Sequence, residues 1–417
     1  MNSFSELSID PRLVSALEKR SITVPTPVQR EVIPALLAGE NLLFQSETGT
    51  GKTFCYLIPA LMKCALAAKD QSPVTLIVAP THELASQIKS EANVLSKDSG
   101  IDASATLCIG GAPLKRQIDA LKEKPAIVVG GPARIIELIR MKKLKVGGIR
   151  MVVLDETDRM LAPEMRDMIR ELLSILPREA QYVACSATLS RYHASLIEKM
   201  IPEPPKPAAD ADSAVDASHA AITPPAAHAH YRIRMINLPP EDVLKRNIEH
   251  WAFFSEGRDK IETLRKFLIA ERPGKALVFT AIAGQVENIA AQLNYKKVPC
   301  SALHAKLDKI GRKKAMDDFR AGRTKVLVTS DLSARGLDIP DVTHVIQLDV
   351  NENEDFFVHR AGRTARAGKS GINVVFGDEF EMKNLSKIEK RLGIVINPKV
   401  LYGGAVRTPV QDGEEEL

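Results

Sequence analysis

A glycine-rich segment that ends in Lys-Thr is the first part of the sequence whose residue types suggest chemistry. Residues 46–53 have the sequence SETGTGKT, between an apolar run that ends near Gln45 and a helical pattern that begins near Lys52. In such a turn, backbone N–H groups and the following helix N-terminus bind phosphate, while Lys52 adds a positive charge and Thr53 offers a hydroxyl to Mg²⁺. Ser46 stands where the strict phosphate-loop pattern has glycine. The segment predicts a nucleoside triphosphate site that a second motif should complete.

An acidic cluster at the end of another apolar run supplies that second motif. Residues 151–158 have the sequence MVVLDETD, in which Asp155 follows four apolar residues. Asp155 can hold the metal ion, and Glu156 can orient or deprotonate the attacking water. The alternative is that the cluster only complements the N-terminus of a helix. Together with the phosphate loop, the cluster favours a nucleoside triphosphate hydrolase.

A third chemical feature is an arginine-rich segment in the second half of the chain. Residues 359–368 have the sequence HRAGRTARAG, with arginines at positions 360, 363 and 366. This spacing predicts one helical face, and a planar guanidinium stabilises charge on a transferring phosphate. The arginines could complete the first site, or they could form a face that binds RNA phosphates.

Two series of apolar runs should position these motifs. Runs rich in Val, Ile and Leu alternate with helical patterns over residues 41–187 and again over residues 276–377, which is typical of buried parallel strands joined by crossover helices. Between the series, residues 202–230 are dominated by Ala and Pro and cannot form a packed core. We therefore expect α/β domains at 1–203 and 245–400, a flexible linker at 204–244 and a short acidic tail at 401–417.

Composition excludes several classes of protein. The 417 residues are 45% hydrophobic and 26% charged, and no apolar run reaches the roughly 18 residues that cross a bilayer. The N-terminus has no leader pattern, so we expect a cytoplasmic protein without a membrane role. The five cysteines lack CxxC spacing, which favours buried free thiols over disulfides or a zinc site. A net charge of +5 is compatible with nucleic acid without being evidence for it. Trp251, the only tryptophan, should pack the first strand of the second domain.

With these motifs in order, the chain resembles the DEAD-box ATP-dependent RNA helicases of superfamily 2, from Phe4 to about Gly393. The motifs that carry the resemblance are Phe4 with IxxPTPVQ (22–29), SETGTGKT (46–53), PTHEL (80–84), Gly110-Gly111, GGPARI (130–135), DETD (155–158), SAT (186–188), VFT (278–280), SDLSARGLD (330–338) and HRAGRTAR (359–366). The resemblance implies two tandem RecA-like parallel-sheet domains joined by the flexible Ala/Pro-rich linker.

The resemblance implies ATP and Mg²⁺ as cofactors. Gln29 would recognise adenine through paired hydrogen bonds, since an amide donor and acceptor match the adenine edge. The other expected ATP contacts are Ser46, Thr48, Gly49, Thr50, Gly51, Lys52, Thr53 and Asp338, with Thr53 and Asp155 on the metal ion. The implied catalytic set is Lys52, Thr53, Asp155, Glu156, Arg363 and Arg366, the last two as arginine fingers. Residues that resemble the family's coupling contacts are Asp158, Ser186, Thr188 and His359.

The resemblance also implies RNA as the main partner, bound mostly through its backbone and therefore independently of sequence. The matching positions are Thr81, Gly111, Arg134, Arg312, Ser330 and Gly336. The implied activity is the separation of short duplexes or remodelling of RNA–protein complexes by a monomer, with protein partners for targeting. An ATP-gated RNA clamp and a DNA-directed motor of the same superfamily are the alternatives.

Several residues depart from the family pattern. His82 replaces the arginine of PTREL, which predicts a lower or pH-dependent RNA affinity. Gly131 replaces a threonine, and a neighbouring alanine replaces a glycine, so one hydroxyl contact to RNA is lost. Lys309 could add a phosphate contact, Thr157 replaces the alanine of the name motif, and Ile22 replaces an aromatic residue that would stack on adenine. None of these changes removes a residue of the expected hydrolytic site.

Overall fold

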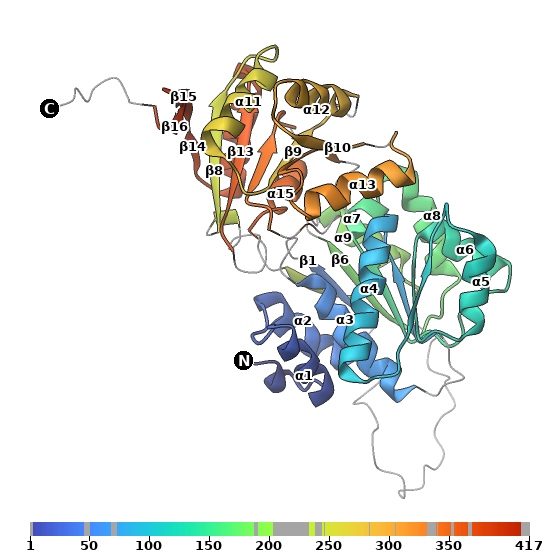
Figure 1. Cartoon of the computed structure of the whole chain (residues 1–417). Helices are drawn as coiled ribbons and strands as arrows, with labels where there is room; N and C mark the ends of the chain where they lie inside the picture. The colour runs from blue at the N-terminus through green and yellow to red at the C-terminus, as the bar shows by residue number, and fades with distance from the viewer. Residues whose placement is uncertain are drawn as a thin grey trace, which may run out of the picture. The chain divides into compact units, whose positions relative to one another are not determined.

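The chain folds around two all-parallel β-sheets, one in each half of the sequence (Figure 1). The structure is a computed structural model, and it describes residues 3–45, 51–67, 73–186, 191–202, 233–237, 244–245, 247–282, 284–304, 306–331, 339, 341–351, 354–365 and 369–409. The described residues up to Asn237 form one compact unit, and those from Leu244 onward form a second. The expectation of an α/β fold with two parallel-sheet domains is confirmed.

In the described part of the first unit, seven strands have the order β3-β4-β2-β5-β6-β1-β7. Their bounds are Leu42–Gln45 (β1), Thr75–Val78 (β2), Ala105–Cys108 (β3), Ile127–Gly130 (β4), Met151–Asp155 (β5), Gln181–Ser186 (β6) and Arg234–Asn237 (β7). The first six coincide with the expected apolar runs. Their central members are buried on both faces, which is why they lack polar alternation.

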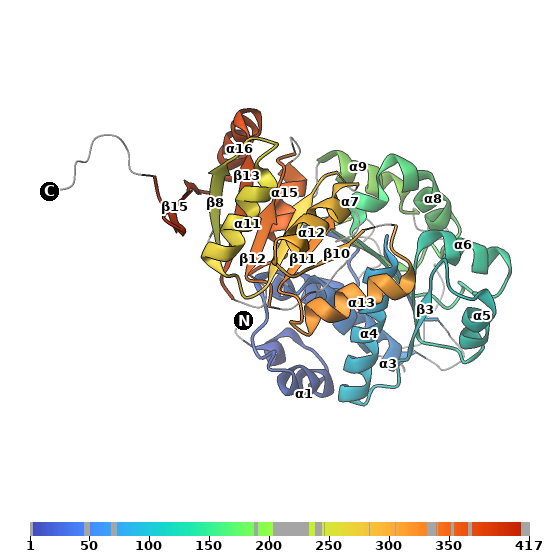
Figure 2. The same ribbon diagram turned by 45° about the horizontal axis from the view of Figure 1, so that its top comes forward.

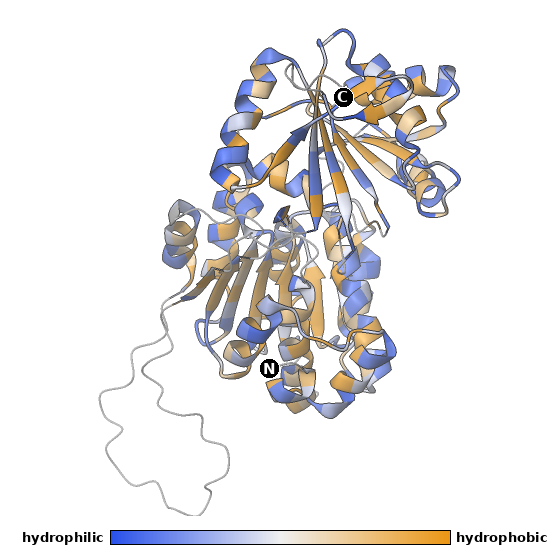
Figure 3. Ribbon diagram, turned by 90° about the vertical axis from the view of Figure 1, so that its left-hand side faces the viewer, coloured by the Kyte–Doolittle hydropathy of each residue, from blue (hydrophilic) through white to orange (hydrophobic). Residues whose placement is uncertain are grey.

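Helices cover both faces of this sheet. Their bounds are Phe4–Leu7 (η1, a 3₁₀-helix), Pro11–Lys19 (α1), Pro27–Leu37 (α2), Lys52–Leu66 (α3), His82–Ser99 (α4), Leu114–Lys122 (α5), Pro132–Arg140 (α6), Thr157–Met160 (α7), Pro163–Ser174 (α8) and Arg191–Met200 (α9). Helices α1 to α4 pack on the face that carries Val153, and α6, α8 and α9 pack on the face that carries Val152. Figure 3 shows the predominantly hydrophobic strands between helices of mixed character. The first unit is therefore a three-layer sandwich.

Strand β7 lies within the range expected as a linker. Residues 234–237 pair in parallel with β1 and add an edge strand to the first sheet, with Ile236 in the core. The expected linker, residues 204–244, therefore contains a structured segment at this point. Sequence reasoning missed it because RMIN is short and has only two adjacent apolar residues.

In the described part of the second unit, seven strands have the order β10-β11-β9-β12-β13-β8-β14. Their bounds are Ile248–Phe254 (β8), Ala276–Thr280 (β9), Cys300–Leu303 (β10), Val326–Ser330 (β11), His344–Gln347 (β12), Gly371–Gly377 (β13) and Ile396–Pro398 (β14). Trp251 in β8 is partly buried and packs against the core, as expected. The predicted strands of this half are thus all present.

Helices also lie on both faces of the second sheet (Figure 2). Their bounds are Lys260–Glu271 (α11), Gln285–Tyr295 (α12), Lys309–Arg320 (α13), Glu354–Ala361 (α15) and Glu379–Leu392 (α16). Helices α11 and α12 share a core with Val278, whereas α13 packs over Phe279, and α15 and α16 pack over Val375. This arrangement repeats the three layers of the first unit.

A small hairpin follows β14, in a region expected to be a tail. Strands β15 (Val400–Tyr402) and β16 (Ala405–Arg407) pair antiparallel, and Leu401 and Val406 pack against the second core. The acidic residues at 412–417 lie outside the described part of the chain.

The cysteine side chains are in the state that their spacing predicts. All five cysteines are buried free thiols, as expected. Among the described residues, no helix combines the length and the apolar character that crossing a bilayer would demand.

Candidate functional site

The expected site residues of the first unit lie at one edge of its sheet. Lys52 follows β1, Thr81 follows β2, Gly111 follows β3 and Arg134 follows β4. Asp155 and Ser186 are the last residues of β5 and β6. The carboxyl ends of parallel strands meet at the same edge, where open α/β sheets bind ligands. The fold therefore brings together motifs that are far apart in the sequence.

The end of the phosphate loop has the backbone that an anion cradle needs. Gly51 has φ of 85° and precedes α3, which begins at Lys52 as expected. A side chain at Gly51 would be strained at this φ and would collide with Nε2 of Gln29. The remaining loop residues Ser46, Thr48, Gly49 and Thr50 lie outside the described part of the chain.

Gln29 connects the start of α2 to this loop. Its side chain is 2% exposed, its Oε1 accepts a hydrogen bond from the backbone N–H of Thr26 at 2.9 Å, and its Nε2 donates to the carbonyl of Gly51 at 3.1 Å. A primary amide has two N–H donors and two oxygen lone pairs. One donor and one lone pair therefore remain, which is the pair that the adenine edge requires.

Asp155 is held by three groups in the interior of the first unit. The carboxylate is 4% exposed, and its Oδ2 accepts a 2.7 Å hydrogen bond from the hydroxyl of Tyr56 in α3. Its Oδ1 accepts from the backbone N–H of Glu156 at 2.9 Å and from Sγ of Cys185 at 3.2 Å. Sequence reasoning missed both Tyr56 and Cys185, because neither belongs to a motif that carries chemistry.

Tyr56 also links the two residues expected to hold the metal ion. Thr53 hydrogen-bonds the same phenol, and burial, reinforced by the charge of Asp155, raises the pKa of Tyr56 well above its usual value. Tyr56 therefore stays protonated and acts as a donor to the carboxylate. The Thr53 hydroxyl and the Asp155 carboxylate, both hydrogen-bonded to the Tyr56 phenol, are hard oxygen donors. Mg²⁺ prefers such ligands and usually takes only one or two of them from the protein.

In the turn after β5, Glu156 is partly accessible to solvent whereas Thr157 is buried. Glu156 is half-buried and has φ of 56° between the strand and α7. Thr157 is buried, and its hydroxyl lies 2.9 Å from the carbonyl of Leu154 and 3.1 Å from that of Cys185. Thr157 thus ties the ends of β5 and β6 together, beside Ser186. Asp158 follows in α7 and is half-buried, and Thr188 lies outside the described residues.

The expected RNA positions of the first unit surround one glycine loop. His82 is exposed at the start of α4, and its ring lies 3.6 Å from where a Cβ of Gly110 would be. Gly111 has φ of 68°, and Arg134 donates to the carbonyl of Ala112 at 3.3 Å. Thr81 caps α4 by accepting from the N–H of Leu84. Arg134 therefore holds the loop at 110–112, and His82 lies beside it.

In the second unit, the expected residues lie near β11 and α15. Ser330 is the buried last residue of β11, Arg312 is half-buried in α13, and His359 lies in the last turn of α15. Arg363 is largely buried and donates through Nε to the carbonyl of His359 at 3.2 Å. The remaining expected positions Gly336, Asp338 and Arg366 lie outside the described part of the chain.

Arg360 differs from the prediction. It is 1% exposed, and its guanidinium donates at 2.6 Å to Asp331 and at 2.8 Å to Asp349. Buried charges persist when they are paired in this way. Because α15 ends at Ala361, Arg360 and Arg363 do not share one helical face, so the prediction is wrong for this pair. Arg360 braces the second unit internally and is not available to a phosphate.

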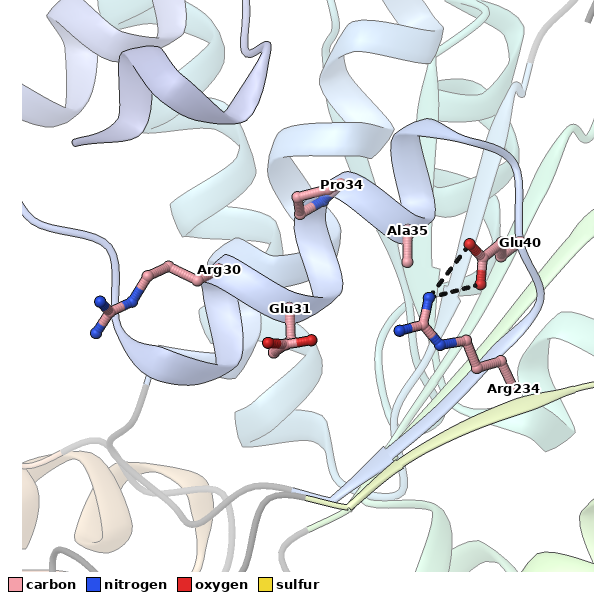
Figure 4. A pocket seen from close by; sticks show the side chains of 6 residues that line it. All are labelled: Arg30, Glu31, Pro34, Ala35, Glu40 and Arg234. Carbon is pink, nitrogen blue, oxygen red and sulfur yellow. Dashed lines mark hydrogen bonds and ion pairs between the residues drawn. The ribbon is translucent and has the colours of Figure 1, made fainter. Parts of the chain in front are cut away.

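A polar hollow of about 520 Å³ lies beside the helix that carries Gln29. Figure 4 shows its lining residues Arg30, Glu31, Pro34, Ala35, Glu40 and Arg234. Arg234 pairs with Glu40 at 3.1 Å. Two arginines and two glutamates balance each other, so this hollow has no net charge that would attract an anion.

Comparisons with known families match both units. The family model described as "DEAD/DEAH box helicase" matches residues 26–196, and the model described as "Helicase conserved C-terminal domain" matches residues 259–368. The first contains the phosphate loop and Asp155. The second contains α15 and the arginine segment.

Individual proteins match along nearly the whole chain. The DEAD-box ATP-dependent RNA helicase CshC of Bacillus cereus is 33% identical over 95% of this chain and 93% of its own length. The probable ATP-dependent RNA helicase YfmL of Bacillus subtilis is 32% identical over 92% of this chain and 93% of its own. Among solved structures, S. cerevisiae Dbp5 bound to RNA and ADP BeF3 has a TM-score of 0.78 and 25% identity, covering 95% of this chain and 96% of the other.

Proposed function

The chain belongs to the DEAD-box ATP-dependent RNA helicases, and we propose that it uses ATP to separate short RNA duplexes or to remodel RNA–protein complexes. The observation that carries the proposal is the connection of Thr53 to Asp155 through Tyr56 at the carboxyl edge of the first sheet. This connection links the helix that follows the expected phosphate loop to the expected metal-binding carboxylate, which supports a nucleoside triphosphate hydrolase.

We propose the following roles at the nucleotide. Gln29 recognises adenine with its remaining donor and lone pair, and Lys52 contacts the terminal phosphates. Thr53 and Asp155 hold Mg²⁺, whose charge neutralises the phosphate oxygens. Ser46, Thr48, Gly49, Thr50 and Gly51 supply backbone contacts, and Asp338 contacts the ribose.

Hydrolysis requires an activated water and stabilisation of the developing charge. Glu156 orients or deprotonates the water, because it is the acidic residue directly after the metal-binding Asp155. Arg363 and Arg366 supply guanidinium charge to the transferring phosphate. Asp158, Ser186, Thr188 and His359 couple the state of the nucleotide to RNA binding.

RNA binding is proposed to be largely independent of sequence. In the first unit, Thr81, Gly111 and Arg134 would contact the sugar–phosphate backbone, with His82 beside them in place of an arginine. In the second unit, Arg312, Ser330 and Gly336 would do the same. We further propose that the chain works as a cytoplasmic monomer whose protein partners select the RNA.

The test is a steady-state ATPase assay without nucleic acid, with single-stranded RNA and with DNA of matched sequence. Stimulation by RNA alone, together with displacement of a strand from a short RNA duplex, is the expected result. Lys52→Ala gives the background rate. Equal stimulation by DNA would contradict RNA selectivity, and RNA-stimulated hydrolysis without strand displacement would favour an ATP-gated clamp.

A further inference from the structure

A second hollow, of about 340 Å³, lies at the amino edge of the first sheet and is rimmed by lysines. It is formed where α5 leads into β4 and where α6 leads into β5. The lysines that line it are Lys122, Lys124, Lys142, Lys143 and Lys145. Its floor includes Leu144 and Pro125, which are buried. The candidate site lies at the other, carboxyl edge of the same sheet.

The positive charge of this lysine pocket is largely uncompensated. Lys122 pairs with Asp119 at 2.7 Å. Within the described residues, no ion pair is found for Lys124, Lys142, Lys143 or Lys145, and all of them are exposed. The hollow in Figure 4 has balanced charges, whereas this one concentrates a single sign.

Favourable interaction with the helix macrodipole explains only some of these lysines. Lysines near a helix C-terminus favour the macrodipole, but the effect fades beyond the last turn. Lys122 is the last residue of α5, so it fits this explanation. Lys143 and Lys145 lie three and five residues beyond Arg140, the end of α6, and the macrodipole does not explain them.

The backbone of both loops is fixed, so the points from which the lysine side chains project are held in place. Lys124 and Lys142 have φ of 51° and 56°. The N–H of Lys124 donates to the carbonyl of Leu121 at 3.2 Å, and the N–H of Lys142 donates to that of Ile139 at 2.8 Å. The loops therefore present an array of cations on ordered turns, at no further cost in backbone entropy on binding.

We propose that the lysine pocket binds the phosphate backbone of an RNA segment that flanks the one engaged at the candidate site. This inference rests on the proposed function, which supplies RNA as the polyanion. Lysine contacts phosphate as a point charge, and the lining residues include no aromatic side chain, so base stacking and sequence selection are not expected. The volume lies within the range of about 300–1,000 Å³ of pockets that take small ligands, which admits a nucleotide unit.

The two places are too far apart for one short strand. The four-residue strand β2 alone separates the two edges by about 13 Å, to which the loops add. A single strand of four nucleotides has its end phosphates about 10 Å apart at 3.4 Å per nucleotide, so when bound at the candidate site it would leave the lysine pocket empty. An adjoining stem or a longer strand could fill it.

The test compares two RNAs on the full-length protein. One is a four-nucleotide single strand, and the other is the same strand joined to a hairpin stem. The pocket variant combines Lys124→Gln, Lys142→Gln, Lys143→Gln and Lys145→Gln. The control variant removes the same charge from exposed lysines of the second unit by Lys266→Gln, Lys325→Gln, Lys387→Gln and Lys390→Gln.

We expect the pocket variant to bind the hairpin RNA about tenfold more weakly, with a salt dependence flattened by about 0.9 per lost phosphate contact. Binding of the four-nucleotide strand, and any stimulation of ATP hydrolysis by it, should be the same in the pocket variant as in the unmodified protein. The control variant should bind both RNAs normally. Equal affinity and equal salt slope of the pocket variant for the hairpin RNA would overturn the inference.

Two further results separate this inference from the proposed function. If RNA fails to stimulate ATP hydrolysis in the unmodified protein, the proposed function fails whatever the pocket does. If polyglutamate binds the unmodified protein and loses affinity in the pocket variant while hairpin RNA does not, the pocket takes an acidic polypeptide and the RNA assignment is wrong.

Discussion

The phenol hydroxyl of Tyr56 donates a 2.7 Å hydrogen bond to Oδ2 of Asp155 in the interior of the first unit. A hydrogen bond to a charged group contributes roughly 1.5–3 kcal/mol, and 1.4 kcal/mol corresponds to about tenfold in rate. If Tyr56 orients the carboxylate for the metal ion, Tyr56→Phe should lower kcat for RNA-stimulated ATP hydrolysis about tenfold. Steady-state kinetics with varied Mg²⁺ would measure this.

Tyr182→Phe is the matched control for that substitution. Tyr182 is another buried tyrosine of the first unit, and its hydroxyl donates to the carbonyl of Pro177 at 2.8 Å. Both variants lose a buried hydrogen bond, which should cost roughly 1.5–3 kcal/mol of stability in Tyr56→Phe, where the acceptor is charged, and about 1 kcal/mol in Tyr182→Phe. An equal fall in kcat for both would show that Tyr56 matters only for folding.

Gln29→Ala should reduce the preference of the enzyme for ATP over GTP. The substitution removes the proposed adenine contact and also the 3.1 Å bond from Nε2 to the carbonyl of Gly51, so affinity for ATP should fall about tenfold. Competition between the two nucleotides in a hydrolysis assay measures the preference. Gln181→Ala removes another buried glutamine of the same unit, whose Nε2 donates to the carbonyl of Leu36 at 3.0 Å, and should leave selectivity unchanged. Unaltered selectivity in Gln29→Ala would mean that adenine is recognised elsewhere.

Glu156→Gln should abolish turnover while ATP and RNA still bind. The amide keeps the size of the side chain but cannot accept a proton from the attacking water. The expected result is a fall of at least a hundredfold in kcat, with a longer lifetime of the RNA complex in ATP. Glu164→Gln, an exposed change in the first turn of α8, should behave as the unmodified protein. Rapid turnover by Glu156→Gln would remove its assigned role.

The strands and the site edge were accessible to sequence reasoning, whereas the tertiary contacts of the site were not. Apolar runs such as MVVLD are buried on both faces of a parallel sheet, and this constraint leaves a clear local pattern. Gly51 was likewise predictable, because only glycine suits its φ beside Gln29.

Contacts between a helix and the strand that it packs on leave no such pattern in the sequence. Tyr56 looks like one more apolar residue of α3, and only the packing of α3 over β5 brings its hydroxyl to Asp155. Arg360 had the same type and spacing as the neighbouring arginines. Asp331 and Asp349 surround its guanidinium and give Arg360 a structural role. Neither this pairing nor the end of α15 at Ala361 can be recognised from the spacing of the arginines.

His82→Arg should strengthen RNA binding and make it more dependent on salt. The position is exposed and lies beside the loop at Gly110 and Gly111, where a guanidinium would add a permanent charge and up to five donors. One added phosphate contact should steepen the slope of log K against log salt by roughly 0.7 for single-stranded RNA. His193→Arg adds the same charge on α9 and should have a smaller effect. Identical slopes for the two variants would place residue 82 off the RNA path.

The stability of the second unit should fall in mild acid because of His344. Burial lowers the pKa of His344 to about 4, although the carboxylate of Glu271 lies 3.7 Å from its Nε2. An unfolded histidine has a pKa near 6.5, so between pH 6.5 and 4 the unfolded state binds more protons than the folded state. The stabilisation is therefore complete above about pH 6.5 and is lost as the pH falls toward 4, by about 3 kcal/mol.

Trp251 makes this loss measurable in the second unit alone. It is the only tryptophan of the chain and lies in β8, so urea titrations followed by its fluorescence report the unfolding of that unit. His344→Gln should be less stable at neutral pH, since it loses the 2.9 Å hydrogen bond between Nδ1 and the hydroxyl of Thr343. Its free energy of unfolding should nevertheless vary less between pH 7 and 4.5 than that of the unmodified protein. His193→Gln, in the first unit, should keep the original pH dependence, and the same dependence in His344→Gln would show that another group titrates.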